Sequence, residues 1–158
     1  MDSGVCNRTP SVVLSRLGLA DAVGPRLSAP PHSAWQLMYF PARHSIYDEG
    51  APPDRLYILV SGSVKLRTAT ADERVLLTVV GPSEMFGAVS LIDHLPRMAS
   101  ATTITAVCAL AIGEDGLRLI LADRPALAAR FMQMLARRVK RADDEIADLA
   151  FADGPGRI

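Results

Sequence analysis

Between Trp35 and about Gly113, short β-rich segments alternate with turn signals that recur every eight to twelve residues. The segments RLYILV and SVKLRTA flank Ser61-Gly62, a residue pair typical of a tight hairpin turn. The segment ERVLLTVV has a period of two, which places three apolar residues on one face of a strand: Val75, Leu77 and Val79. Many short strands at this spacing predict an antiparallel sandwich, jelly roll or barrel.

The chain on either side of this region has a different character. Residues 1–34 hold one short apolar stretch and several prolines, so we expect a short helix and an irregular lead-in. Residues 35–122 form the predicted β domain. Residues 123–153 are expected to form one long helix with Pro125 in its first turn, and residues 154–158 follow it. The predicted class is therefore mainly β with flanking helices.

One face of the long helix carries an apolar heptad seam. Seven apolar residues follow each other at alternating spacings of four and three: Ala128, Met132, Leu135, Val139, Ala142, Ile146 and Leu149. This pattern favours a parallel two-stranded coiled coil. The alternative is a helix that packs on its own domain, but Leu127, Phe131 and Met134 form a second stripe for that purpose. We therefore predict a homodimer held by the seam.

The charge balance gives no support for nucleic-acid binding by the bulk of the chain. Among 158 residues there are 17 basic and 17 acidic side chains, and the pI is about 6.8. A basic cluster on the long helix is followed at once by three acids, and we interpret it as a solvated face: Arg137, Arg138, Lys140 and Arg141. No direct DNA binding is expected of this chain alone.

The sequence favours a cytoplasmic protein without a membrane segment. The first ten residues lack the apolar run of a signal peptide, and the most apolar stretch, residues 99–113, is too short to span a bilayer. The two cysteines, Cys6 and Cys108, cannot form a disulfide framework and fit a reducing compartment. We expect Cys108 to be a buried apolar residue and Cys6 to be the more accessible thiol.

Enzyme and metal chemistry find no support in the sequence. No Gly-x-Ser-x-Gly, His-Glu-x-x-His or Walker-type motif occurs, and the cysteines lack metal-ligand spacing. The three histidines, His32, His44 and His94, are scattered among loops and β segments. We expect a non-catalytic protein without a metal site, and a thiol or haem sensor remains a third functional alternative.

Three stretches of the sequence together resemble one family. They are DEGAPPDRLYILVSGSVKL, GPSEMFGAVSLIDHLPRMASATTIT and LARRVKRADDEIADLAFADGPGRI. From about Phe40 to Ile158 the chain resembles the cyclic-AMP receptor and fumarate–nitrate regulator family of bacterial transcription factors. The resemblance implies an eight-stranded β-roll of the jelly-roll type, then a long dimerisation helix. It also implies a winged helix-turn-helix that reads DNA, and no such motif fits within these 158 residues.

The resemblance also implies a cradle for a cyclic phosphate. Its residues would be the turn around Gly87, Ala88 and Val89, then Arg97, which pairs with the phosphate, and Met98. The family's ribose-binding acid matches Ala88, and its phosphate-contacting Ser or Thr matches Met98. On the long helix, the pair that holds the adenine amine matches Ala142 and Asp143. We expect the absent groups to weaken cyclic AMP binding by about 3–6 kcal/mol. The structural alternative for Arg97 is an ion pair with an acid such as Asp93 or Glu84.

The functional hypothesis is the sensory and dimerisation module of such a regulator, with cyclic AMP binding weakened or lost. The alternative is a working receptor for cyclic AMP or another small anion that controls DNA binding by a following domain. No cofactor is certain from the resemblance: cyclic AMP is a possible ligand, and some relatives in the family bind haem. Besides the homodimer, a heterodimer with a full-length relative is an expected partnership.

Overall fold

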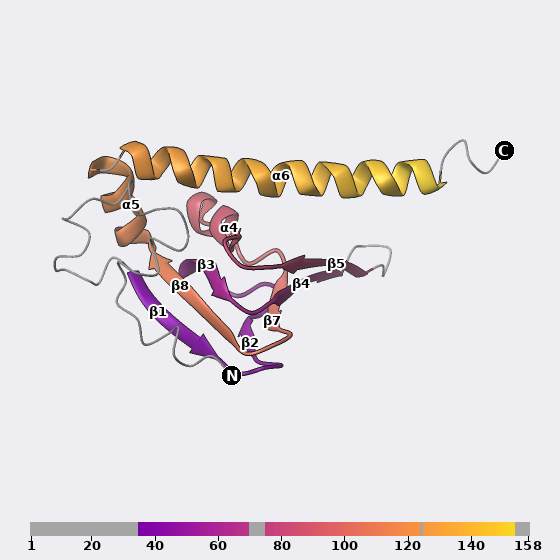
Figure 1. Ribbon diagram of the computed structural model, residues 1–158, viewed down its shortest axis with the longest axis horizontal. Coiled ribbons are helices and arrows are strands. Elements are labelled where there is room, and N and C mark those ends of the chain that lie inside the picture. Colours follow the sequence, from indigo (N-terminus) through magenta and orange to yellow (C-terminus); the bar gives the residue numbers. More distant parts are fainter. Residues whose placement is uncertain (1–34, 70–74, 124, 154–158) are drawn as a thin grey trace.

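The computed structural model describes residues 35–69, 75–123 and 125–153, so the expectations for residues 1–34 and 154–158 lie outside it. The described part contains eight strands in two four-stranded antiparallel sheets, shown in Figure 1. The first sheet holds, in spatial order, β1 (Trp35–Phe40), β8 (Val107–Gly113), β3 (Arg55–Ser61) and β6 (Met85–Phe86). The second holds β2 (Ser45–Tyr47), β7 (Ser100–Thr103), β4 (Val64–Ala69) and β5 (Val75–Val80). The predicted eight-stranded, mainly β class is confirmed.

Three strands of the first sheet, β3, β6 and β8, are largely buried on both faces. These strands divide their side chains between two hydrophobic clusters because successive residues point to opposite faces. On β3, Leu56 and Ile58 belong to the cluster under the helices, whereas Tyr57 and Leu59 belong to the cluster inside the roll. The short strand β6 follows the same rule, with Met85 on the helix side and Phe86 inside. This explains why β8 is a continuous apolar run rather than an alternating one.

The predicted hairpin at Ser61-Gly62 is wrong. β3 pairs with β8 and β6, whereas β4 pairs with β5 and β7, so this turn carries the chain from one sheet to the other. The register of β3 shifts just before the turn, and Gly62 has a φ of 90°. A Cβ at Gly62 would overlap the Ala106 carbonyl oxygen. The position therefore needs glycine to let two corners of the roll approach, as at corners where strands change sheets.

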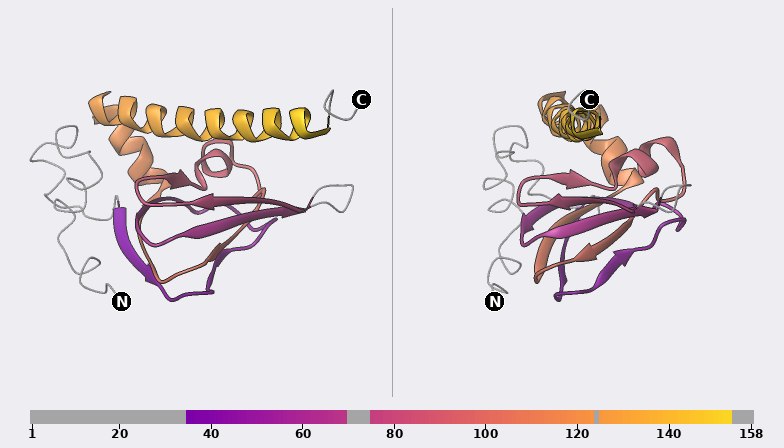
Figure 2. Two further views of the ribbon diagram at one scale, coloured as in Figure 1. Left: turned by 45° about the vertical axis from the view of Figure 1, so that its right-hand side comes forward. Right: turned by 90° about the vertical axis from the view of Figure 1, so that its right-hand side faces the viewer.

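Three helices complete the described part. α4 (Ala88–Asp93) follows β6, α5 (Glu114–Asp123) follows β8, and α6 (Pro125–Asp153) is the long helix. Figure 1 shows α6 running along one side of the roll above α4, and the end-on view in Figure 2 confirms that it lies outside the sheets. As predicted, Pro125 begins α6, where its missing N–H has no cost.

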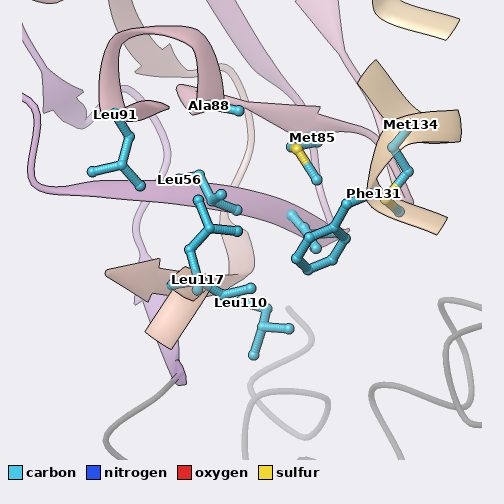
Figure 3. Packing of buried hydrophobic residues seen from close by; sticks show 10 residues of the cluster. Leu56, Met85, Ala88, Leu91, Leu110, Leu117, Phe131 and Met134 are labelled. Carbon is cyan, nitrogen blue, oxygen red and sulfur yellow. The ribbon is translucent and has the colours of Figure 1, made fainter. Parts of the chain in front are cut away.

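The first half of α6 packs on the roll through a narrow stripe. Phe131 and Met134 are 4% and 3% exposed and join the cluster that contains Met85 and Leu117. Figure 3 shows Phe131 and Met134 beside Met85, with Leu117 of α5 close by. The second apolar stripe therefore packs on the helix's own domain, as the sequence predicted for Phe131 and Met134; the side chain of Leu127 lies outside the described ones.

Candidate ligand cradle

The backbone at Gly87 makes the turn on which the candidate cradle is built. Gly87 follows β6 directly, has a φ of 77°, and precedes the first residue of α4. A Cβ at this position would lie 2.8 Å from Nη1 of Arg97. Because L-residues rarely adopt this φ and the arginine leaves no room, the close approach of Gly87 and Arg97 requires glycine.

Arg97 lies almost completely inside the protein, at 2% exposure. Its Nη1 donates to the Gly87 carbonyl oxygen at 2.7 Å and to Ser90 Oγ at 2.8 Å. Its Nη2 donates to the Arg55 carbonyl oxygen and to Asp54 Oδ1, the latter at 3.3 Å. The buried Nε has no hydrogen-bond partner within the described part of the chain. The guanidinium is thus held by acceptors from β3, the cradle turn and α4.

An aromatic stack lies against the guanidinium of Arg97. Its Cζ sits 4.1 Å from the centre of the Tyr47 ring, a cation–π geometry. Tyr47 stacks on Tyr57 with ring centres 6.3 Å apart, and Tyr57 stacks on Phe86 at 5.2 Å. Burial raises the pKa of Tyr47 to about 12, against the opposing effect of the nearby Arg97. These rings form one inner wall of the roll beneath the cradle.

The acid that pairs with Arg97 is Asp54, not Asp93 or Glu84 as the sequence suggested. Asp54 comes just before β3 and is itself largely exposed, since 65% of its side chain is accessible. Glu84 instead accepts a hydrogen bond from Arg141 of α6 at 2.6 Å. Sequence reasoning missed Asp54 because no spacing rule links it to a residue 43 positions away.

The other predicted cradle residues offer no polar side-chain group. Ala88 is 3% exposed and belongs to the cluster under the helices, with Leu56 and Leu91. Val89 and Met98 are 48% and 54% exposed. The Met98 carbonyl oxygen accepts a 3.0 Å hydrogen bond from Thr68 Oγ1. The structure therefore brings together Gly87 and Arg97, with Ala88 buried beside them and two apolar side chains outside.

The helix side of the candidate site differs from its prediction. Ala142 and Asp143 lie on α6, but their side chains are outside the described ones. Arg138 and Arg141, expected on a solvated face, are only partly exposed, whereas Arg137 and Lys140 are exposed. The charge of Arg138 also lowers the pKa of Tyr47, so this cation lies near the cradle wall. The sequence could have indicated this position of Arg138 and Arg141, because positions 131, 134, 138 and 141 share one helix face.

The predicted dimer seam is accessible where its side chains are described. Met132 and Val139 are 68% and 60% exposed, whereas Leu135 packs partly against the cluster under the helices. Ala128 is partly exposed. The side chains of Ala142, Ile146 and Leu149 lie outside the described ones. Met132 and Val139 lie on a different face of α6 from the packed Phe131 and Met134, and their exposure is consistent with a coiled-coil seam. The dimer itself stays a prediction.

Cys108 is 1% exposed, as predicted, but it takes part in a disulfide rather than lying as a free apolar thiol; Cys6 and His32 lie outside the described residues. His94 is exposed and lies 3.5 Å from a Glu114 carboxylate oxygen. The described ranges hold no cluster of potential metal ligands, and none of their helices is long and apolar enough to cross a membrane.

The cradle, the roll and the long helix together define a class of protein. A family model of the cyclic nucleotide-binding domain matches residues 37–124, and the chain belongs to this family. The chain is 44% identical, over 92% of its length, to the CRP-like cAMP-activated global transcriptional regulator of Mycobacterium tuberculosis (strain ATCC 25618 / H37Rv), of which it covers 66%. It is 32% identical, over 80% of its length, to the cyclic AMP receptor protein of Thermus thermophilus, of which it covers 59%. The chain thus spans about two thirds of the length of these relatives or less.

Solved structures agree with this family. The N-terminal domain of a transcriptional regulator from Streptomyces coelicolor A3(2) is 36% identical, with a TM-score of 0.60 over 84% of this chain and 95% of that one. The Thermus thermophilus catabolite activator protein is 26% identical, with a TM-score of 0.64 over 82% of this chain and 63% of that one. The resemblance found in the sequence is confirmed.

Proposed function

We propose that this chain is the sensory and dimerisation part of a cyclic-AMP-receptor-type transcription regulator, with weak or lost cyclic AMP binding. It acts in the cytoplasm as a homodimer joined by the seam of α6, and a winged helix-turn-helix in the same regulator binds DNA. A heterodimer with a full-length relative uses the same seam.

One observation carries the proposal of weak binding: both terminal nitrogens of Arg97 already donate to protein acceptors. A bound phosphate must replace some of these bonds rather than add to them, so its net gain is small. The side chains of Ala88 and Met98 supply neither the carboxylate nor the hydroxyl that the family uses for ribose and phosphate. Among the described residues, the one donor of the guanidinium without a hydrogen-bond partner is Nε.

A titration with cyclic AMP followed by NMR tests this proposal, because amide signals detect binding in the millimolar range. We expect the amides of Gly87 and Ala88 to shift without saturating at micromolar ligand. Met98→Ser returns a hydroxyl at an exposed position and is expected to tighten binding by about two- to tenfold. Leu95→Ser is the matched control, because Leu95 is 44% exposed in the same turn.

Micromolar saturation of the unmodified chain would contradict weak binding and support the second candidate, a working cyclic AMP receptor. The similarity to a regulator named as cAMP-activated favours this candidate, and so does Nε of Arg97, which has no hydrogen-bond partner in the described part of the chain. An equal response of Met98→Ser and Leu95→Ser would show that position 98 does not contact the ligand.

A further inference from the structure

Glu84 uses its two carboxylate oxygens for two different parts of the fold. Oε1 accepts a hydrogen bond from the Gly81 backbone N–H at 2.9 Å, within the turn between β5 and β6. Oε2 accepts from Nη1 of Arg141, on α6, at 2.6 Å. The two residues are 57 positions apart, and their side chains are 33% and 41% exposed. A carboxylate fixed on one side by backbone leaves its other oxygen in a defined place for the arginine.

The turn that holds Glu84 is fastened to the first sheet and leads straight into the cradle. The Ser83 N–H donates to the Leu59 carbonyl oxygen at 2.7 Å, and the Leu59 N–H donates to the Glu84 carbonyl oxygen at 2.9 Å. β6 then spans only Met85–Phe86, and Gly87 follows. Only the two residues of β6 therefore separate Glu84 from Gly87, whose carbonyl oxygen accepts a hydrogen bond from Arg97.

α6 contacts the same short segment in two ways. Phe131 and Met134 share a hydrophobic cluster with Met85, as Figure 3 shows, and Arg141 is bonded to the neighbouring Glu84. Positions 134 and 141 are two helical turns apart on one face. Along that face α6 packs against Met85 of β6 and, further along the helix, forms an ion pair with Glu84, the residue before β6. The opposite side of the helix exposes Val139, a predicted seam residue.

We propose that Glu84 and Arg141 are positioning residues whose ion pair couples the cradle turn to the dimerisation helix. The pair fixes the axial and rotational position of α6 against β6, because a helix that slides or turns must either break the pair or pull Glu84 with it. A displacement of Glu84 reaches Gly87 through the two residues of β6. The inference rests on the proposed function, since it assigns the link between the sensing site and the dimer.

The test compares charge-neutral variants on both sides of the pair by NMR of the full chain. Glu84→Gln keeps an oxygen that accepts from Gly81 but removes the charge, and Arg141→Gln removes the partner. We expect the amide signals of Gly87 and Ala88 to shift and to exchange with solvent severalfold faster in both variants. The double variant is expected to change these signals by less than the sum of the two single changes, because both remove the Glu84–Arg141 ion pair.

Two further variants separate coupling from simple attachment of the helix. Lys140→Gln removes a neighbouring exposed charge and is expected to leave Gly87 unchanged, whereas Arg141→Lys keeps the charge and is expected to restore most of the Gly87 signal. Should Glu84→Gln fail to fold, the two Arg141 variants make the same comparison from the helix side. Changes confined to residues 81–84 and the surroundings of position 141 would overturn the proposal.

The dimer provides a second readout. Sedimentation is expected to show a two- to fivefold change in the dimer dissociation constant for Arg141→Gln and none for Lys140→Gln. A chain that stays monomeric contradicts the proposed dimer, but the Gly87 effect in the monomer still supports the positioning pair. A dimer with weak cyclic AMP binding and an unaffected Gly87 contradicts the pair alone.

Discussion

At the scale of the residue, Arg97 connects segments of the chain that are distant in the sequence. Its guanidinium bonds to the backbone of Gly87 and Arg55 and to the side chains of Ser90 and Asp54, and it lies against Tyr47. A planar group with several donors in one plane can satisfy these acceptors together, and a lysine ammonium cannot. The residue predicted to pair with a phosphate is therefore a structural centre in this chain.

We expect Arg97→Lys to lower the free energy of unfolding by about 2 kcal/mol or more, because buried acceptors would lose their donors. Urea unfolding followed by circular dichroism measures the change. Arg118→Lys is the control, since Arg118 pairs with Glu114 at 2.7 Å but is 71% exposed; we expect a change within about 0.5 kcal/mol. Equal effects of the two substitutions would mean that the burial of Arg97 contributes nothing to stability.

The corner at Gly62 supports a second prediction at this scale. Gly62→Ala would place a Cβ against the Ala106 carbonyl oxygen and in a backbone conformation that alanine avoids. We expect the free energy of unfolding, measured by thermal unfolding, to fall by at least about 2 kcal/mol. Gly50→Ala is the matched control, because Gly50 also has a positive φ but no atom within 4 Å of its added Cβ. It should cost only the backbone strain, and a cost equal to that of Gly62→Ala would rule out the steric contact.

At the scale of the element, α6 presents two apolar faces with different partners. Phe131 packs under the helix at 4% exposure, and its neighbour Met132 is 68% exposed on the predicted seam. Phe131→Ala is expected to lower the free energy of unfolding by about 3–5 kcal/mol. Met132→Ala is expected to leave the stability of the monomer within about 0.5 kcal/mol and to weaken the dimer. Urea unfolding at low concentration and sedimentation over a concentration series separate the two effects.

Met132→Asp sharpens this comparison, because a charge at a seam position opposes association more strongly than a truncation does. An unchanged dissociation constant for Met132→Asp would place the dimer interface elsewhere. Loss of dimer with Phe131→Ala at a concentration where the monomer is still folded would mean that the two faces are not independent.

The strands show which features of the fold can be predicted from the sequence. The period of two correctly placed Val75, Leu77 and Val79 on one face of β5, opposite the buried Val80. That face is exposed in the chain as described, and so is Leu76 on the other face, so the period of two does not separate a buried face from an exposed one in this edge strand. The partner of β3 could not be found in the same way, since β8 lies about fifty residues further on. Local patterns define strands and their faces, whereas pairing depends on contacts distant in sequence.

The candidate site follows the same division. The motif predicted the turn at Gly87 and the position of Arg97 ten residues later, because both are local in the sequence. It did not predict the acceptors of Arg97 at Asp54 and Arg55, or the inward position of Arg141. The orientation of a helix about its own axis is set by what it packs on, here Met85 and Glu84. Periodicity describes a helix face but does not identify its neighbour.

At the scale of the whole molecule, two tyrosines inside the roll make the fold less stable at alkaline pH. Burial raises the pKa of Tyr47 to about 12, with a smaller rise from Tyr57, and burial also raises the pKa of Tyr57. In both cases the folded protein favours the neutral phenol more than the unfolded chain does. The contribution of these groups to stability is complete below about pH 10 and is lost as the pH rises towards 12.

We therefore expect the free energy of unfolding to fall between pH 10 and pH 12, with about 2 kcal/mol of the fall due to Tyr47. Tyr47→Phe keeps the ring against Arg97 but has no proton to lose, so the fall should become shallower by that amount. Tyr39→Phe is the matched control, because Tyr39 is 46% exposed and is expected to leave the pH profile unchanged. Urea unfolding at half-unit pH steps gives the slopes. A Tyr47→Phe profile that coincides with that of the unmodified chain would mean that the Tyr47 phenol reaches water in the folded state, and the inner wall of the cradle would then be open to a polar ligand.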